Sequence, residues 1–248
     1  REIIKASHQV ELYDEELKCE PFKKIGIKTL KPFKINKNIN KAINQIGEIN
    51  KKILDNKLFP LTLGGEHSIT PGCIKPFVKK YKKITLLHFD AHADLRESYS
   101  GEKFSHASAI KRCIDYKNVS VISFGIRNIS AEEIPILNKN KERIEIYWAK
   151  DKKKWDLKKF KRQIKSKNVY ITFDVDGLDS SIMPATGTPE PGGIFWDEAL
   201  EIIKIACKNS KIIGADVNEL APIKGFNSYN FLVAKLVYKI LSYKFLLK

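Results

Sequence analysis

Metal-ligating side chains follow an apolar stretch near the middle of the chain. Residues 84–89 lead directly into Asp90, His92 and Asp94. In an extended backbone alternate side chains point to the same side, so these three side chains are expected to converge where the strand ends. His88 has the same parity but lies one step inside the strand. We therefore expect it to be a buried histidine behind the ligands, and not a ligand itself.

Three other apolar stretches end in residues of the same kind. Residues 169–173 lead into Asp174 and Asp176, which share a face by the same alternation. The remaining two stretches, 58–63 and the one that starts at Ile212, run into Gly64-Gly65-Glu66-His67 and into Asp216, Asn218 and Glu219. If these stretches are parallel strands of one sheet, their polar ends meet at a single crevice.

So many carboxylates in one crevice would repel one another strongly unless cations lay among them. The set is too rich in oxygen for a structural zinc site, and carboxylates with some imidazole suit Mn²⁺ best. It also holds more ligands than one ion takes, whereas two ions ~3.5–4 Å apart can share bridging carboxylates. The sequence therefore predicts two Mn²⁺ per chain. A single Asp-x-His-x-Asp could be a solvated strand end, but the repeated clusters weigh against that interpretation.

Apolar stretches typical of strands alternate with segments of helical periodicity. The predicted strands cover residues 24–30, 58–63, 84–89, 119–124, 144–148, 169–173 and 212–217. The predicted helices cover residues 39–54, 71–81, 107–116, 131–137, 157–164, 196–207 and 229–246, and Ser130 with Glu133 forms a capping box ahead of one of them. This alternation predicts an α/β fold, a single three-layer α/β/α domain over residues 1–248 with a mostly parallel sheet.

Four motifs, taken in order, resemble the ureohydrolases, the family of arginase, agmatinase and formimidoylglutamase. They are Gly64-Gly-Glu-His-Ser68, Asp90-Ala-His-Ala-Asp94, Phe173-Asp-Val-Asp-Gly-Leu-Asp179 and the Pro/Gly-rich loop at residues 184–193. The resemblance runs from Gly64 to Glu219, and the region before Gly64 is less distinctive. It implies an arginase-like fold and the hydrolysis of a guanidino compound.

The resemblance also implies a role for each matching residue. One Mn²⁺ would be held by His67, Asp90, Asp94 and Asp174, and the other by Asp90, His92, Asp174 and Asp176, so that Asp90 and Asp174 bridge the ions. The catalytic roles fall to Asp94, which would orient the attacking water and carry protons, to His106, which resembles the family's mobile proton shuttle, and to Glu219, which would pair with the substrate guanidinium. Asp179 is expected to be a turn residue that caps the following loop.

Two departures from the commonest family pattern bear on the substrate. Glu66 stands where Asp is more frequent, and we expect this change to have a small effect. Residues 95–106 do not show the Asn/Ser-rich stretch with which arginase reads an α-amino acid, and they look like the agmatinase version. The resemblance therefore favours agmatine, whose hydrolysis gives urea and putrescine for polyamine biosynthesis. Arginase, guanidinobutyrase and formimidoylglutamase activities stay open as alternatives.

The composition bounds other classes of function. Lys and Arg number 45 against 29 Asp and Glu, which gives a net charge of +16. The basic residues are scattered and form no recognised nucleic-acid motif, so we expect a solvated surface and no nucleic-acid partner. A basic nucleic-acid-binding module stays open as the alternative from another class. The sequence contains no run of about 18 apolar residues, which a membrane-spanning helix would need. The four cysteines form no Cys-x-x-Cys pair, which fits reduced thiols in a cytoplasmic protein.

The remaining expectations concern the assembly, the start of the chain, Arg127 and a competing class of metallohydrolase. The family forms trimers and hexamers, so the resemblance implies a homo-oligomer. The sequence begins at Arg1 and not at Met, which is compatible with natural residues upstream. Arg127 could shape the crevice or an interface, or it could simply form an ion pair, and the sequence favours neither interpretation. A related metallohydrolase such as a deacetylase would hold a single zinc ion, so the number of bound ions separates the two classes.

Overall fold

The structure, a computed structural model, describes residues 1–247. At its centre lies a six-stranded sheet in the order β1-β6-β5-β2-β3-β4. The strands are β1 (Leu61–Leu63), β2 (Ile84–Phe89), β3 (Val119–Phe124), β4 (Ile144–Tyr147), β5 (Asn168–Asp174) and β6 (Lys211–Asn218). Every pairing between these strands is parallel, so the predicted mostly parallel sheet is confirmed.

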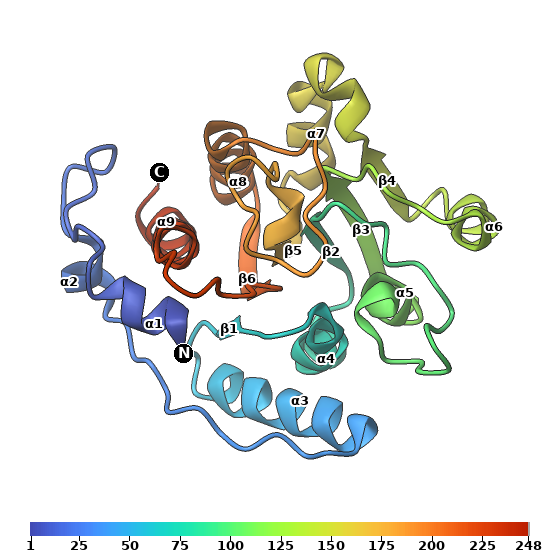
Figure 1. The fold of residues 1–248 in the computed structure, drawn as a ribbon, viewed down its shortest axis with the longest axis horizontal. Helices are drawn as coiled ribbons and strands as arrows, with labels where there is room; N and C mark the ends of the chain where they lie inside the picture. The colour runs from blue at the N-terminus through green and yellow to red at the C-terminus, as the bar shows by residue number, and fades with distance from the viewer. Residues whose placement is uncertain (248) are drawn as a thin grey trace.

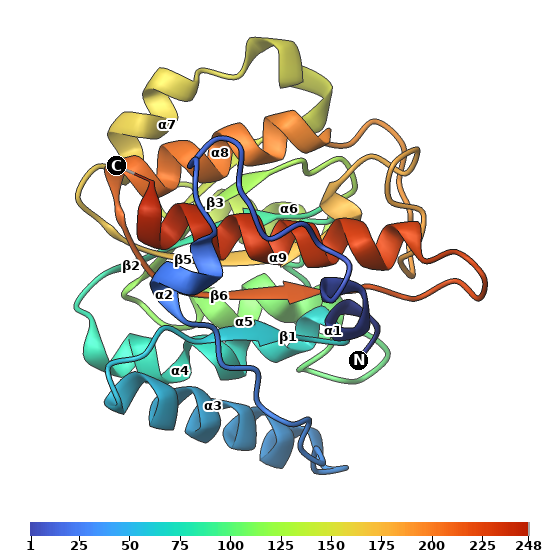
Figure 2. The same ribbon diagram turned by 90° about the vertical axis from the view of Figure 1, so that its left-hand side faces the viewer.

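Helices cover both faces of the sheet and give the three predicted layers (Figure 1). One face carries α7 (Leu157–Ile164), α8 (Trp196–Asn209) and α9 (Ser228–Leu246), with the short α1 (Glu2–Ser7) and α2 (Pro21–Ile25) packed on α9. The other face carries α4 (Thr70–Lys80) and α5 (Ala109–Ile114), with α3 (Ile39–Asp55) packed outside α4, and α6 (Ile134–Lys139) lies near the β4 edge. Figure 2 shows α9 running across the sheet with the N-terminal segment beside it.

The central strands are apolar almost throughout because helices bury both of their faces. All six residues of β2 are buried. Leu87 and Phe89 belong to the core under α8 and α9, whereas Ile84 and Leu86 belong to the core under α4 and α5. This alternation between the two cores is the strand periodicity that the sequence shows.

The prediction is wrong at the N-terminal side of the chain. Residues 24–30 were expected to form a strand, but Pro21–Ile25 forms α2 and the chain then continues without strand pairing. Pro21 occupies the first turn of this helix, where its fixed φ favours helix formation. The predicted strand over 58–63 is also shortened to β1, because Leu58 is exposed and Pro60 has no N–H to donate.

One local expectation from the sequence, the pairing of Ser130 with Glu133, is confirmed. At the predicted capping box, the N–H of Ser130 donates to the Glu133 carboxylate at 2.7 Å, and the N–H of Glu133 donates to the Ser130 carbonyl at 3.1 Å. All four cysteines are free thiols, and Cys73 and Cys113 are buried. Across residues 1–247, the structure contains no helix with the length and apolar character needed to cross a membrane.

Arg127 ties together the loops at the carboxyl edge of the sheet. Its guanidinium lies 2.7 Å from the carbonyl oxygens of Asp176 and Glu190, 2.9 Å from that of Gly125 and 3.1 Å from that of Leu178. These partners are carbonyl oxygens and not carboxylates. Of the two interpretations left open by the sequence, the contacts therefore favour a residue that shapes the crevice.

Asp179 closes the loop that follows β5, as predicted. Its Oδ2 accepts hydrogen bonds from the N–H groups of Gly192 at 2.7 Å and Gly193 at 2.8 Å, and its Oδ1 accepts one from Ser181 at 3.0 Å. Burial acts to raise the pKa of Asp179, but the hydrogen bonds from Ser181 and the two glycines outweigh it and lower the pKa to about 2. The ionised carboxylate therefore stabilises this wall of the site.

Asp179→Asn tests this contribution. The depressed pKa means that the carboxylate stabilises the fold above its unfolded pKa near 4, and that this stability is lost as the pH falls toward 2. We expect the variant to lose about 1–2 kcal/mol of unfolding free energy at pH 7, and roughly half of that difference at pH 3. Urea-induced unfolding of the parent and the variant at pH 7 and at pH 3 measures this difference in unfolding free energy. Asp55→Asn, at the exposed end of α3, is the control, and an undiminished difference at pH 3 would contradict the assignment.

Candidate metal centre

The ends of four neighbouring strands bring the predicted ligands and Glu219 to one edge of the sheet. In the strand order, β1, β6, β5 and β2 lie side by side, and all of them point the same way. His67 begins a short 3-10 turn after β1, and Asp90 directly follows β2. Asp174 is the last residue of β5, and Asp176 lies in the short turn after it. The six predicted metal ligands thus come from three of these strand ends.

His67 lies at the centre of the first group of ligands. Its Nδ1 is 3.0 Å from Asp90 Oδ2, 3.1 Å from Asp94 Oδ2 and 3.4 Å from Asp174 Oδ2. The side chain is only 1% exposed, and within residues 1–247 its Nδ1 has no hydrogen-bond partner of good geometry. A buried imidazole nitrogen that faces three carboxylate oxygens is a donor set that fits a divalent cation.

His92 forms a second group that shares Asp90 with the first. Its Nδ1 is 3.0 Å from Asp176 Oδ2 and 3.5 Å from Asp90 Oδ1. The two oxygens of Asp90 therefore face different histidines, Oδ2 facing His67 and Oδ1 facing His92. Two groups of side chains have potential ligand atoms within 4.8 Å of one another. The first group is His67, His88, Asp90 and Asp94, and the second is Asp90, His92 and Asp176. The arrangement fits two cations that share a carboxylate.

The charges in this cluster shift the pKa values of its members in opposite directions. Burial acts to raise the pKa of Asp90, but hydrogen bonds from His67, His88 and His92 outweigh it and hold the pKa well below its usual range. Burial and the charge of Asp90 raise the pKa of Asp94 to about 7. Burial opposes charge on His92, yet Asp176 and Asp90 raise its pKa to about 11. Protons therefore provide the counter-charge that the carboxylates need, and bound cations could replace them.

Two ligand-type residues have a strained backbone. Asp94 has φ +52° and Glu219 has φ +65°, in the left-handed region that few side chains adopt. The surroundings hold Glu219 in place, because its N–H donates to the Gly65 carbonyl at 2.7 Å and its Oε1 accepts from the His67 N–H at 2.5 Å. Strain of this kind persists where the fold fixes a functional side chain. Burial also raises the pKa of Glu219.

Glycines let the loops approach the ligands closely. A Cβ on Gly177 would lie 2.7 Å from the backbone nitrogen of Asp90, and one on Gly64 would lie 2.2 Å from Asn218 Oδ1. A side chain at residue 177 would press on the backbone of Asp90, and one at residue 64 would displace the side chain of Asn218. This explains why glycines flank the ligand-type residues in the sequence.

His106 lies at the edge of the cluster rather than inside it. Its side chain is 48% exposed, and its Nδ1 is 3.2 Å from Glu66 Oε1. Ser68 Oγ donates to the other carboxylate oxygen of Glu66 at 2.6 Å, and the ring of Tyr99 packs edge-on against His106 at 5.4 Å. The pairing of Glu66 with His106 was not predicted from the sequence. The longer glutamate side chain in place of aspartate is the only signal that could have suggested it.

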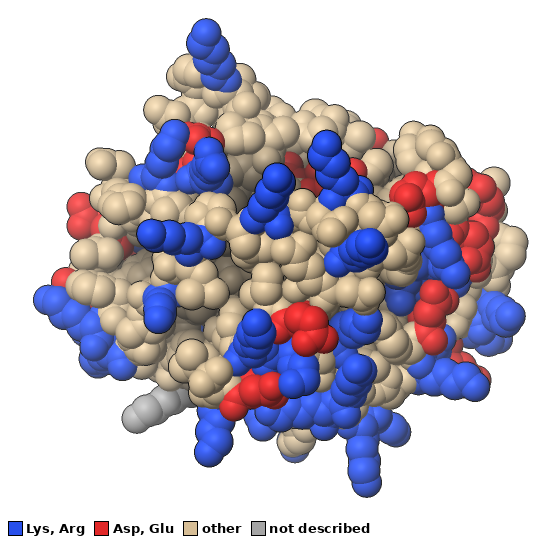
Figure 3. Space-filling view, turned by 90° about the horizontal axis from the view of Figure 1, so that it is seen from below, with Lys and Arg blue, Asp and Glu red and all other residues tan. Residues whose placement is uncertain are grey.

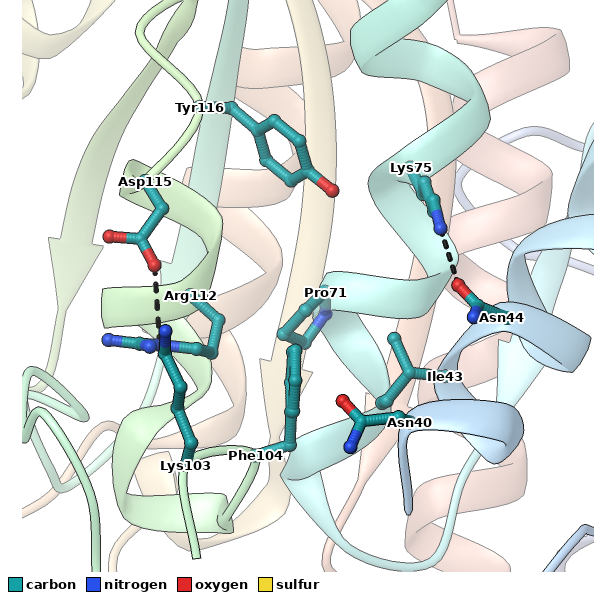
Figure 4. A pocket seen from close by; sticks show the side chains of 10 residues that line it. All are labelled: Asn40, Ile43, Asn44, Pro71, Lys75, Lys103, Phe104, Arg112, Asp115 and Tyr116. Atoms are coloured by element: carbon teal, nitrogen blue, oxygen red, sulfur yellow. Dashed lines mark hydrogen bonds and ion pairs between the residues drawn. The ribbon is translucent and has the colours of Figure 1, made fainter. Parts of the chain in front are cut away.

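Two other surface features lie apart from this cluster. A cavity of about 280 Å³ opens between α3, α4 and α5, where Lys75 bonds Asn44 and Arg112 pairs with Asp115 (Figure 4). Within residues 1–247, none of the residues that line this cavity belongs to the His/Asp cluster. Lys and Arg side chains are spread over the face seen in Figure 3, with acidic side chains among them.

Comparison with known proteins agrees with this geometry. A model described as "Arginase family" matches residues 1–242. An N(1)-aminopropylagmatine ureohydrolase of Synechocystis sp. is 32% identical over 250 residues, which cover 97% of this chain and 80% of that protein. An agmatinase of Bacillus anthracis is 39% identical over 196 residues, which cover 75% of this chain and 63% of that protein, just under two thirds of its length.

A solved structure shows the same architecture. The agmatine ureohydrolase of Thermoplasma volcanium superposes with a TM-score of 0.87 at 28% identity, covering 98% of this chain and 81% of that one. The family match covers residues 1–242, which include all the strand ends that carry the ligand cluster. The chain belongs to the arginase family of ureohydrolases.

Proposed function

We propose that this chain is a binuclear metal hydrolase of guanidino compounds that converts agmatine to putrescine and urea. The observation that carries the proposal is the pair of histidine–carboxylate groups that share Asp90. Family membership supports hydrolysis of an amidino or guanidino substrate and does not favour the nucleic-acid-binding alternative.

The donor set supports two Mn²⁺ ions. One would be held by His67, Asp90, Asp94 and Asp174, and the other by Asp90, His92, Asp174 and Asp176. Carboxylate-rich ligation with some imidazole is the combination that suits Mn²⁺. When bound, such a pair of ions supplies the Lewis acidity that makes water nucleophilic near neutral pH.

The side chains of this chain would orient the reactants and move the protons. Glu219, half-buried and held beside His67, would accept N–H groups of the planar guanidinium and present its carbon to the attacking water. Asp94 would orient that water and take up its proton. The exposed His106, paired with Glu66, would deliver a proton to the departing amine.

The surroundings of the cluster favour a cationic substrate. Glu66 stands beside His106, and Glu190 lies 3.9 Å from His92 Nε2 and accepts a hydrogen bond from Asn128 at 2.8 Å. Carboxylates at these positions would attract a dicationic guanidine although the whole chain is basic. The relative from Synechocystis sp., which matches 97% of this chain, favours N(1)-aminopropylagmatine as the second candidate substrate. Arginine and 4-guanidinobutyrate stay open as further candidates.

The family resemblance also supports finer proposals about the working enzyme. It would be one catalytic domain over residues 1–248, in a cytoplasmic homo-oligomer that is a trimer or a hexamer. Light scattering on the purified protein tests the assembly.

A substrate panel tests the activity. With Mn²⁺ present, we expect agmatine to yield urea and putrescine in equal amounts, and chelation followed by Mn²⁺ addition should abolish and then restore turnover. The panel includes N(1)-aminopropylagmatine, arginine, 4-guanidinobutyrate and formimidoylglutamate, the last scored for formamide. Turnover that survives complete removal of divalent ions, or urea from arginine alone, would contradict the proposal.

Asp174→Ala tests the metal centre. Because Asp174 would bridge both ions, we expect at least about a 100-fold loss of turnover together with weaker Mn²⁺ binding. Metal content per chain and urea release are measured on the same preparation. Asp55→Ala, on the exposed end of α3, is the matched control and should behave like the parent. Urea release at the parent rate from Asp174→Ala would refute the assignment.

A further inference from the structure

A row of polar side chains crosses the sheet just below the ligand cluster. Ser123, His88, Thr172 and Asp216 are side-by-side partners on β3, β2, β5 and β6. All four are at most 3% exposed. His88 bonds Asp90 Oδ2 at 2.9 Å and Ser123 at 2.9 Å. Polar side chains at such depth need satisfied hydrogen bonds, so the row is a built feature of the core.

Thr172 is the member of this row that touches His67. Its Oγ1 lies 2.9 Å from His67 Nε2, 2.7 Å from Asp216 Oδ1 and 3.1 Å from Thr70 Oγ1. A threonine hydroxyl has one proton to donate, so it can donate to only one of these three neighbours, and the carboxylate oxygen of Asp216 is the nearest of them.

Asp216 decides the direction of this hydrogen bond. Its Oδ1 also lies 3.0 Å from Thr70 Oγ1 and 2.6 Å from Asn218 Nδ2, so three donor groups converge on a single oxygen. An oxygen in such a position is an acceptor. Thr172 therefore gives its proton to Asp216 and accepts the Nε2–H of His67.

We propose that Asp216, acting through Thr172, is a positioning residue that keeps the proton of His67 on Nε2 and so leaves Nδ1 as the metal-binding atom. Nδ1 is the nitrogen that faces Asp90, Asp94 and Asp174. The inference rests on the proposed metal centre. It adds a role for two buried residues that would not touch substrate or metal. A hydrogen bond to the non-ligating nitrogen of a histidine fixes the tautomer and the ring orientation that a metal requires.

Mn²⁺ affinity separates this role from simple packing. Thr172→Val keeps the side-chain volume but removes the hydroxyl, whereas Thr172→Ser keeps the hydroxyl. By calorimetry on metal-stripped protein, we expect Thr172→Val to bind Mn²⁺ about 10–100-fold more weakly, and Thr172→Ser within about threefold of the parent. Thr85→Val is the matched control, since Thr85 is a buried threonine on β2 that bonds Ser120 away from the cluster.

A double-mutant cycle tests whether Asp216 acts through Thr172. Asp216→Ala should weaken Mn²⁺ binding as Thr172→Val does, and the double variant should be no weaker than the more affected single variant, because both remove one relay. Fully additive losses would overturn the relay, as would a Thr172→Val variant that binds Mn²⁺ as tightly as the parent. Thermal melts establish that each variant is folded.

The parent protein gives a measurement that needs no variant. With ¹⁵N-labelled histidine and bound ¹¹³Cd²⁺, we expect the metal coupling on Nδ1 of His67 and the proton on Nε2. A coupling on Nε2 would overturn the inference even if every variant failed to fold. If the parent bound no divalent ion at all, the proposed function would fail. If the parent bound ions but Thr172→Val bound them equally well, only this inference would fail.

Discussion

Repulsion among buried carboxylates is the constraint on which the rest of this structure depends. Asp90, Asp94, Asp174 and Asp176 are all nearly inaccessible to solvent, and they meet around His67 and His92. Such a group is stable only with positive charge among its members. The pKa shifts within the cluster express this need, because the pKa values of Asp94 and Asp174 are raised by burial and by neighbouring carboxylates, while those of His67 and His92 are raised by the carboxylates around them. A pair of divalent cations would meet the same need and add reactivity.

The sheet and the loops contribute differently to the arrangement of these charged side chains. The parallel sheet brings the strand ends into register at one edge, and the loops then aim individual side chains. To orient these side chains, the backbone adopts the left-handed conformation at Asp94 and Glu219. At Gly177 the loop after β5 also comes close to the backbone of Asp90. Arg127 and Asp179 hold these loops through backbone hydrogen bonds. The site is therefore rigid where it would bind metal and more exposed at His106, where it would exchange protons.

The layer below the ligands connects the site to the interior of the sheet. His88 supports Asp90 there, and Thr172 supports His67. Each therefore reaches one of the residues expected to bind metal, while Asp216 completes the row from the neighbouring strand. The layer therefore supports the expected ligands from the sheet rather than from the loops.

The sequence by itself determined the class of fold and predicted which residues would bind metal. Alternation places Asp90, His92 and Asp94 on one side of a strand end, and continuous apolar strands occur in sheets that helices cover on both faces. It failed over residues 24–30, because alternating apolar residues do not reveal whether a strand edge is available to pair with. Only the tertiary structure decided the strand order β1-β6-β5-β2, the pairing of Glu66 with His106, and the contact of Thr172 with His67 and Asp216. These contacts join residues far apart along the chain, and local periodicity contains no information about which strands become neighbours.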